Sequence, residues 1–323
     1  MGIRLLTRPA SALLALAVVL APTALGATAM SAHAVAPATN FTVKVGSQTT
    51  SMSVQGQRFL PGDVTIDAGD SVTWQANSAE IHTVTFINGG QPQVNVPPFN
   101  PTDATQLTPQ GGSTMAGSGN FNSGLMTSSS SFPPIPVPVA HSYTLTFPTA
   151  GTYTYYCLVH GAMMRGVVHV QPTGTAYPYS QADINAGAAF EAAAINAHGR
   201  DLMARAAALS TNHKVFTGQD DGIAMTMRFS LKKIVIHKGD TVHFKNTMSQ
   251  GAPHTVTFGT VPSGAALFAP AGNPKNFKGG NLHSGIIGPG GTFAVTFNKV
   301  GRFHYVCGLH QDMGMKAMVV VKK

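Results

Sequence analysis

The sequence predicts an all-β protein: two tandem Greek-key β-sandwich domains joined by a helical connector. Three observations lead to this prediction. Charged residues make up only 10% of the 323 residues, against 43% hydrophobic ones. Short segments alternate apolar and polar residues with a period of two, which is the pattern of a half-buried strand. The second part of the chain also repeats the order of segments found in the first, so one fold is expected twice.

Strand-like segments of the first copy begin near Phe41. Residues 64–66 and 72–74 alternate in polarity, and Ala68-Gly69-Asp70 between them has the composition of a turn. Further alternating segments lie at 83–86, 143–147, 153–156 and 167–170. An irregular stretch at about 88–138, rich in Gly, Pro and Ser, interrupts them. A loop of this length inside a domain is usually functional or mobile.

The repeat is visible as matched blocks of sequence. VTIDAGDSVTW becomes IVIHKGDTVHF, IHTVTF becomes PHTVTF, FNSGLM becomes LHSGII, and YTLTFPTAGTYTYYC becomes FAVTFNKVGRFHYVC. The irregular loop is longer in the first copy, and loops absorb such insertions at little cost. We predict short antiparallel strands in two similar domains, residues 35–171 and 218–323.

The first 34 residues have the three parts of a secretory signal peptide. Arg4 and Arg8 form a charged start, residues 12–20 are apolar, and Ala32-His33-Ala34 is a cleavage sequence of A-x-A form. The alternative is a membrane anchor, for which the apolar core is short. We predict export to a secreted, periplasmic or cell-surface location, without stable membrane insertion after cleavage.

Residues 172–217 differ from both copies and predict the helical connector. Ser180-x-x-Asp183 has the form of a capping box at a helix start. Ile195, Leu202 and Leu209 follow at intervals of seven, which places them on one helix face. A flexible coil is the alternative, because two glycines inside the segment weaken a helix.

The net charge limits the classes of partner. The chain carries +8 at neutral pH, and about +6 without the signal peptide, which favours acidic partners or anionic cell-surface polymers. The sequence has no basic run and no platform of basic and aromatic residues, so nucleic acid is not a predicted partner. The oligomeric state is not predicted.

One short motif in each copy holds the candidate functional residues. It reads YYCLVHGAMMRGVV in the first copy and YVCGLHQDMGMKAMVV in the second, and each has an upstream histidine that opens an identical HTVTF. A thiolate at a strand end, an imidazole three residues later and an imidazole from a neighbouring strand can meet at one pole of a sandwich. Such soft and borderline donors with a weak Met contact favour copper, whereas zinc prefers a fourth strong ligand. The candidate ligands are His82, Cys157 and His160 in the first copy and His254, Cys307 and His310 in the second.

HTVTF, then C-x-x-H with a nearby Met, then a final strand resembles the cupredoxins, the plastocyanin, pseudoazurin and amicyanin family of blue copper proteins. The resemblance covers about residues 41–171 and 218–323. It implies one type 1 copper per domain, hence two copper ions per chain, each carrying single electrons between Cu(I) and Cu(II). It also implies that the second histidine of each site, His160 or His310, is exposed in an apolar patch as the doorway for electrons.

The resemblance also implies an axial methionine in each site. In the second copy Met315 follows a glycine, as in the pseudoazurin form. In the first copy Met163 and Met164 compete, and Met164-Arg165-Gly166 matches the Met-x-Gly exit of the family, which favours Met164. Family members often have Asn after the first histidine, bonding near the thiolate. This chain has Thr83 and Thr255 there, so that contact is not expected in its usual form.

Other interpretations stand beside electron transfer. Multicopper oxidases and copper nitrite reductases usually place a histidine directly beside the type 1 cysteine, and this chain has neither that histidine nor a His-x-His pair. We therefore predict no enzyme. Copper storage or delivery is the main alternative, because the ligand loops are rich in Met. A disulfide between Cys157 and Cys307 would have to join equivalent poles of the two domains.

The remaining histidines and methionines predict ordinary structural roles. Trp74 is expected in the core of the first domain and His283 as part of a loop, and surface or packing roles are expected for His141, His169, His237, His243, His304, Met225, Met227, Met248 and Met318. The sequence as a whole predicts an exported two-domain copper protein that shuttles single electrons between redox partner proteins.

Overall fold

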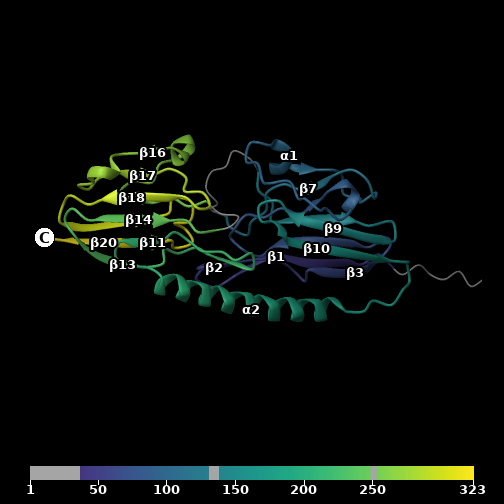
Figure 1. Cartoon of the computed structure of the whole chain (residues 1–323). Helices are drawn as coiled ribbons and strands as arrows, with labels where there is room; N and C mark the ends of the chain where they lie inside the picture. The colour runs from purple at the N-terminus through teal and green to yellow at the C-terminus, as the bar shows by residue number, and fades with distance from the viewer. Residues whose placement is uncertain (1–36, 131–137, 249–252) are drawn as a thin grey trace, which may run out of the picture. The chain divides into compact units, whose positions relative to one another are not determined.

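Four β-sheets make up most of the structure, a computed structural model that describes residues 37–130, 138–248 and 253–323 (Figure 1). The sheets form two sandwiches, each with its own apolar core. The predicted all-β fold is therefore confirmed. The predicted signal peptide lies outside the described residues. Within those residues, no helix combines the length and the apolar character needed to cross a membrane.

The first sandwich consists of a five-stranded and a six-stranded sheet. In spatial order the first sheet contains β12 (Ala224–Thr226), β2 (Val54–Leu60), β1 (Asn40–Gln48), β4 (Ser71–Ala76) and β8 (Ser142–Thr146). The second contains β3 (Asp63–Asp67), β10 (Gly161–Gln171), β9 (Gly151–Cys157), β5 (Thr85–Phe86), β7 (Phe121–Ser123) and β6 (Pro109–Gln110). Trp74 is fully buried between them, as expected, with its ring edge-on to those of Phe86 and Tyr155.

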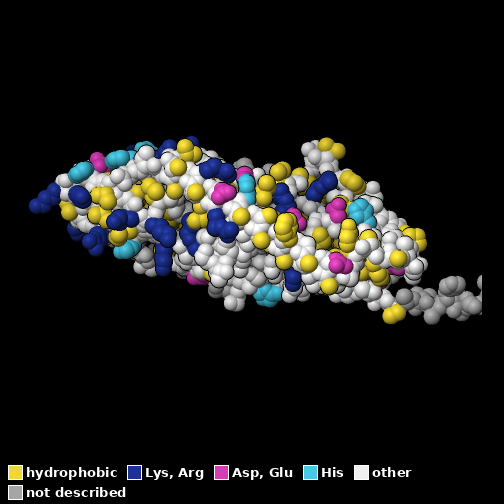
Figure 2. Space-filling model, turned by 90° about the horizontal axis from the view of Figure 1, so that it is seen from below, with side chains coloured by type: hydrophobic (Ala, Val, Ile, Leu, Met, Phe, Trp, Pro, Cys, Tyr) yellow, Lys and Arg dark blue, Asp and Glu magenta, His cyan; other side chains and the backbone are white. Residues whose placement is uncertain are grey.

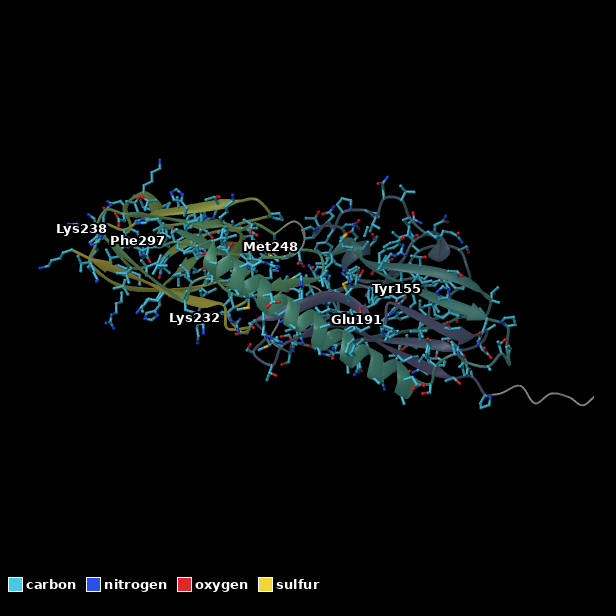
Figure 3. All side chains as sticks on the ribbon, turned by 60° about the horizontal axis from the view of Figure 1, so that its bottom comes forward. Tyr155, Glu191, Lys232, Lys238, Met248 and Phe297 are labelled. Carbon is cyan, nitrogen blue, oxygen red and sulfur yellow. The ribbon has the colours of Figure 1, made fainter. Side chains whose placement is uncertain are left out.

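The second sandwich consists of a three-stranded and a six-stranded sheet. The smaller sheet contains β11 (Lys214–Phe216), β14 (Thr241–Lys245) and β18 (Thr292–Thr296). The larger contains β13 (Lys233–His237), β20 (Lys316–Lys322), β19 (Gly301–Val306), β15 (Thr257–Phe258), β17 (Leu282–Ser284) and β16 (Pro270–Ala271). Its core is aromatic, with Phe258 packed against Phe297 and Tyr305. Figure 3 places Tyr155 in the first sandwich and Phe297 in the second.

The predicted turn between two strands is present in both copies. In the first, the carboxylate of Asp70 accepts the backbone N–H of Asp67 at 2.8 Å. In the second, Asp240 accepts the N–H of His237 at the same distance. An aspartate side chain that accepts the backbone N–H three residues earlier closes a tight turn. This explains why the A-G-D and K-G-D sequences join strands that are consecutive in the chain, β3 to β4 and β13 to β14.

The prediction of antiparallel strands throughout is wrong for two pairs in each sandwich. Strand β1 runs parallel to β4, and β3 runs parallel to β10. The second sandwich repeats this with β11 beside β14 and β13 beside β20. Period-two alternation shows which face of a strand is buried, but it carries no information about the direction of the neighbouring strand.

A strand from the second half of the chain completes a sheet of the first sandwich. Strand β12 pairs antiparallel with β2, with Met225 opposite Gln55. The backbone N–H of Gln57 also donates to the carbonyl of Ile223 at 2.9 Å. The sequence repeat gave no sign that a strand of the second copy pairs with a strand of the first, because each strand could equally belong to its own copy.

The long helix α2 (Gln181–Ala208) covers this shared sheet (Figure 1). Ser180 and Asp183 form the predicted capping box: each side chain bonds the backbone of the other residue. Ile195 and Leu202 are buried as predicted, but Leu209 is 63% exposed. The helix ends at Ala208, so Leu209 no longer faces the sheet.

The irregular stretch predicted at about 88–138 contains short elements where it is described. These are a 3-10 turn (Asn88–Gly90), α1 (Ala104–Leu107), β6 and β7. The second copy has 3-10 turns at Gly264–Phe268 and Pro274–Asn276 in the corresponding region. The Pro-rich part at 131–137 lies outside the described residues.

The packing of α2 gives a first testable prediction. Ile195 is 5% exposed and packs with Val54, Leu60 and Ala224, whereas Phe190 on the same helix is 80% exposed. Ile195→Ala is expected to lower the free energy of unfolding by about 2–5 kcal/mol, because it leaves a cavity beside the shared sheet. Phe190→Ala is the matched control, with an expected change within about 0.5 kcal/mol. Urea denaturation measures both, and equal effects would contradict the packing described.

Candidate metal centres

In the first sandwich, three candidate ligands from separate segments meet in the interior. Cys157 ends β9, His160 follows in the next turn, and His82 is held by backbone hydrogen bonds in both directions with Met126. Sγ of Cys157 lies 3.2 Å from Nδ1 of His160 and 3.9 Å from Nδ1 of His82. All three side chains are buried, and their ligand atoms lie within 4.8 Å of one another.

The second sandwich repeats this arrangement. Sγ of Cys307 lies 3.4 Å from Nδ1 of His310 and 3.8 Å from Nδ1 of His254. The two Nδ1 atoms are 3.2 Å apart. His254 is again held by backbone bonds in both directions, here with Ile287. Because each set presents one sulfur and two imidazole nitrogens to a common point, the residues fit a metal ion that prefers soft and borderline donors.

The candidate axial methionines are buried beside their cysteines. Met164 is fully buried in the same core cluster as Cys157, while Met163 is 52% exposed. Met315 is fully buried in the cluster that contains Cys307. The burial therefore favours Met164 over Met163, and it agrees with the expectation for Met315.

A threonine follows the first histidine in each site and holds the cysteine and the residue after it. The backbone N–H of Thr83 donates to Sγ of Cys157 at 3.4 Å, and its hydroxyl accepts the N–H of Leu158 at 2.8 Å. Thr255 makes the same pair of contacts with Cys307 and Gly308, at 3.3 and 2.7 Å. The strand of the first histidine is thus fastened to the loop that follows the cysteine.

The outer nitrogens of the first histidines have different partners in the two sites. Nε2 of His82 lies 2.8 Å from Oγ of Ser78, whereas Nε2 of His254 lies 3.0 Å from Sδ of Met248. The thioether of Met248 can only accept, which places the ring proton of His254 on Nε2 and leaves the lone pair of its Nδ1 directed at the site. The hydroxyl of Ser78 can donate or accept, and a cation on Nδ1 of His82 would require it to accept. A glycine lies against each ring, and a Cβ at Gly46 or Gly218 would come within 2.7 or 2.4 Å of Nε2.

Burial keeps the candidate ligands neutral in the metal-free protein. It raises the pKa of the Cys157 thiol to about 11 and raises the pKa of Cys307 as well. It lowers the pKa of His160 to about 3 and that of His310 to about 4. Burial, and then the neighbouring imidazole, lower the pKa of His82 and His254 further. The imidazoles are therefore ready to bind a cation, whereas each thiol must release a proton to do so.

The expectation of an exposed second histidine is wrong in both sites. His160 and His310 are only 2% and 4% exposed. Nε2 of His160 has no hydrogen-bond partner among the described residues, and Nε2 of His310 lies 3.6 Å from Oε2 of Glu80 in the other sandwich. Glu80 itself is buried, which raises its pKa to about 7. The sequence offered no signal for this contact, because it joins residues of different copies.

The recurring x-Ser-Gly loop supports the strand of the first histidine. Ser123 exchanges hydrogen bonds with Val84, and Ser284 does the same with Val256. His283 is buried rather than a loop decoration, with its two ring nitrogens bonded to Thr257 and to the carbonyl of Leu267. The recurrence of this block in both copies was the signal that it had a structural role.

Both cysteines are free thiols in the structure, so the disulfide alternative is wrong. Three of the methionines predicted to be packing residues, Met225, Met227 and Met248, gather beside the second site. Met225, Met227, Met248 and Met313 are buried together, with Met52 of the first sandwich against them. Met248 is the member of this cluster that also contacts a candidate ligand (Figure 3).

Comparison with known proteins identifies relatives for part of the chain. The family of copper binding proteins described as the plastocyanin/azurin family matches residues 214–322. Plastocyanin of Scenedesmus fuscus is 30% identical over 132 residues, which is 40% of this chain and 98% of the relative. Chloroplastic plastocyanins of Physcomitrium patens and Chlamydomonas reinhardtii are 32% and 29% identical over 32% of this chain. The chain spans only 54% and 63% of the length of these two relatives.

Solved structures of small copper proteins match segments of similar size. Reduced auracyanin from Roseiflexus castenholzii is 19% identical, covering 34% of this chain and 95% of its own, with a TM-score of 0.24. A mutant of amicyanin in the Cu(I) form is 20% identical, covering 36% and 90%, with a TM-score of 0.23. These TM-scores are too low to assign the fold, which follows from the sheets described above. The sequence relationship shows that the chain belongs to the plastocyanin/azurin family of copper-binding proteins.

Proposed function

We propose that this protein binds one type 1 copper in each sandwich and transfers single electrons. One observation carries the proposal: a buried set of one cysteine sulfur and two histidine nitrogens, within 4.8 Å of one another, occurs twice in the chain. Two such sets in matching positions are not explained by ordinary packing, because a pair of buried imidazoles is costly unless its nitrogens are bound. The proposed ligands are His82, Cys157, His160 and Met164 in the first site and His254, Cys307, His310 and Met315 in the second.

The donor set supports copper over zinc. A structural zinc site uses four strong ligands in a tetrahedron, whereas each set here offers three strong donors and one thioether. A trigonal His₂Cys site with a weak axial Met is typical of copper that changes oxidation state without rearrangement. Bound copper would supply the redox chemistry, and the protein would hold the donors, exclude water and keep the ring protons on the outer nitrogens.

Electron transfer is favoured over catalysis by the residues that flank each cysteine. The two His-Cys-His sets are the groups of three metal-binding side chains found among the described residues. Residues directly beside each cysteine are apolar, aromatic or glycine: Tyr156 and Leu158 in one copy, Val306 and Gly308 in the other. Neither pair offers a ligand for the second copper at which oxygen or nitrite would react.

Copper storage or delivery is the second candidate, and the buried methionine cluster beside the second site favours it. Thioethers prefer Cu(I), so this cluster has the chemistry of a route for copper loading. The two functions differ in a measurable way. A carrier of electrons retains copper in both oxidation states, whereas a delivery protein releases Cu(I) readily to a chelator.

The distribution of charge supports an acidic redox partner. Residues 218–323 hold 12 Lys and Arg against 4 Asp and Glu, whereas residues 35–171 hold 3 against 5. Figure 2 shows the Lys and Arg side chains gathered over the second sandwich, and Lys232 and Lys238 are among its exposed residues. Such a surface would steer an acidic protein or another anionic partner toward the second site. Export by the N-terminal signal remains part of this proposal.

The proposal predicts two blue copper centres per chain. The Cu(II) protein is expected to bind two copper ions and to show an intense visible band that a reductant bleaches, because each thiolate donates charge to its copper. Cys157→Ser and Cys307→Ser should each remove about half of the band and one copper ion. Absorption spectroscopy with metal analysis tests this, and a colourless protein loaded with two coppers would contradict it.

The first site also predicts different effects for two adjacent methionines. Met164→Leu should retain copper but shift the visible spectrum and raise the reduction potential of the first site. A tenfold change in the one-electron equilibrium corresponds to about 59 mV, and a shift of this order is expected. Met163→Leu is the matched control, because that side chain is half exposed, and it should leave both properties unchanged. Spectroelectrochemical titration distinguishes them; the reverse pattern would assign the axial role to Met163.

The lowered histidine pKa values predict loss of stability in acid. In the metal-free protein, His160 and His310 stay neutral down to about pH 3 and 4, whereas the unfolded chain protonates them near pH 6.5. The unfolded state then binds more protons, so the free energy of unfolding should fall by about 2 kcal/mol per histidine between pH 6.5 and pH 5. Urea denaturation across this range tests it, with His243→Gln at an exposed position as control. The raised pKa of Glu80 acts in the opposite direction over the same range, so the measurement is made in Glu80→Gln. A flat profile in that variant would show that the imidazoles are not buried.

A further inference from the structure

The buried carboxylate between the two candidate sites is the feature that the proposed function leaves unexplained. Glu80 is 3% exposed, and its Oε2 has no hydrogen-bond partner among the described residues. That atom lies 3.6 Å from Nε2 of His310, which is 4% exposed. The backbone N–H of Ile81 is one partner of this carboxylate. Its Oε2 atom is left without one, and a buried carboxylate oxygen without a partner is costly. The ring nitrogen Nε2 of His310 is the group that faces this atom.

Glu80 also belongs to the first site through the chain itself. It stands two residues before His82, with Ile81 between them. One short segment therefore carries a ligand of the first site and touches a ligand of the second. The contact to His310 is slightly longer than a hydrogen bond in the metal-free structure. A cation on Nδ1 of an imidazole makes its Nε2–H a stronger donor, which would tighten this contact.

Among the described residues, the first copy contacts a candidate ligand of the second site, but the second copy makes no matching contact with the first site. Nε2 of His160 has no partner among the described residues. The residue two before His254 is Ala252, which has no donor or acceptor side chain. The contact is therefore not a by-product of the duplicated fold but a feature of the first copy alone.

Two arginines hold the two ligand loops against the opposite sandwich. Arg58 donates from Nη1 to the carbonyl of Met163 in its own ligand loop and to the carbonyl of Gly222 beyond the repeat boundary. Arg228 donates to the carbonyl of Met313 in the second ligand loop and to that of Ser51 in the first sandwich, each at 2.6 Å. Together with the β2–β12 pairing, these bonds fix the relation between Glu80 and His310.

We propose that Glu80 joins the two copper centres into one electron-transfer unit, through the path His82, Ile81, Glu80 and His310. The inference rests on the proposed function. With copper bound at both sites, one electron would pass from a Cu(I) centre, which would become Cu(II), to a Cu(II) centre, which would become Cu(I). No bond is broken, and the proton on Nε2 of His310 stays in place. Glu80 acts here as a positioning and coupling residue and does not touch either metal.

The test compares Glu80→Leu with Glu80→Gln in protein loaded with two coppers. Leucine has a similar volume and no acceptor, and an apolar residue in place of a buried charge is often neutral or stabilising, so the variant should fold. Glutamine keeps an acceptor oxygen without the charge. Asp201→Leu is the control, because this exposed carboxylate lies on α2 and belongs to neither site.

The first readout is the rate at which an electron redistributes after pulsed reduction of one copper per chain. The parent protein and each Glu80 variant also carry Met164→Leu in this experiment, because that substitution should separate the spectra and the reduction potentials of the two centres. With Glu80 in place, and also in the Glu80→Gln variant, redistribution should be fast and independent of protein concentration. Glu80→Leu should lose this phase and leave only a slow redistribution that depends on collisions between molecules. An unchanged intramolecular phase in Glu80→Leu would overturn the inference.

The second readout is the reduction potential of the second centre, which a purely structural role would not change. Removing the acceptor from His310 makes the imidazole a weaker donor to Cu(II). Glu80→Leu and, to a smaller degree, Glu80→Gln should therefore shift the one-electron equilibrium toward Cu(I), by about tenfold or ~59 mV for the former. If Glu80→Leu does not fold, an unchanged potential in Glu80→Gln overturns the inference. If the parent protein lacks two blue centres, the proposed function itself has failed.

Discussion

The proposed metal sites depend on one hydrogen-bonded junction that occurs in each sandwich. Thr83 and Thr255 bind the cysteine sulfur with their N–H and the next residue's N–H with their hydroxyl. Each junction joins segments more than fifty residues apart and brings the first imidazole to the thiol before any metal is present. A donor set fixed in this way changes little between oxidation states, which is what rapid electron transfer requires.

The second constraint is that the two sites are covered by protein. In the relatives suggested by the sequence, an exposed histidine would be the route to a partner, but here His160 and His310 are both buried. Electrons exchanged with another protein must therefore cross covering residues. At the first site this cover includes Leu158 and Val159, which line a cavity of about 540 Å³ together with residues 94–99. The covered sites favour exchange inside the molecule over exchange at its surface.

Sequence patterns predicted the parts of this structure that depend on neighbouring residues. Alternation identified strands near 64–66, 72–74, 143–147, 153–156 and 167–170, the capping box located the start of α2, and the repeated Cys and His residues lie together in the interior. The directions of the strands, the pairing of β12 with β2 and the contact of Glu80 with His310 depend on residues far apart in the chain. A pattern within one segment shows which of its side chains are buried. It does not show which other segment packs against it, because a partner from either copy would fit.

The duplication produced two sites with the same donor atoms but different surroundings. Nε2 of His82 faces the hydroxyl of Ser78, whereas Nε2 of His254 faces a weaker acceptor, the sulfur of Met248. Glu80 adds a carboxyl group to the second site, and the first has no equivalent among the described residues. If bound copper tightens the contact of Glu80 with His310 into a charge-assisted hydrogen bond, that bond would be about twice as strong as a neutral one. The second copper would then be the better stabilised as Cu(II), and an electron placed there would move toward the first.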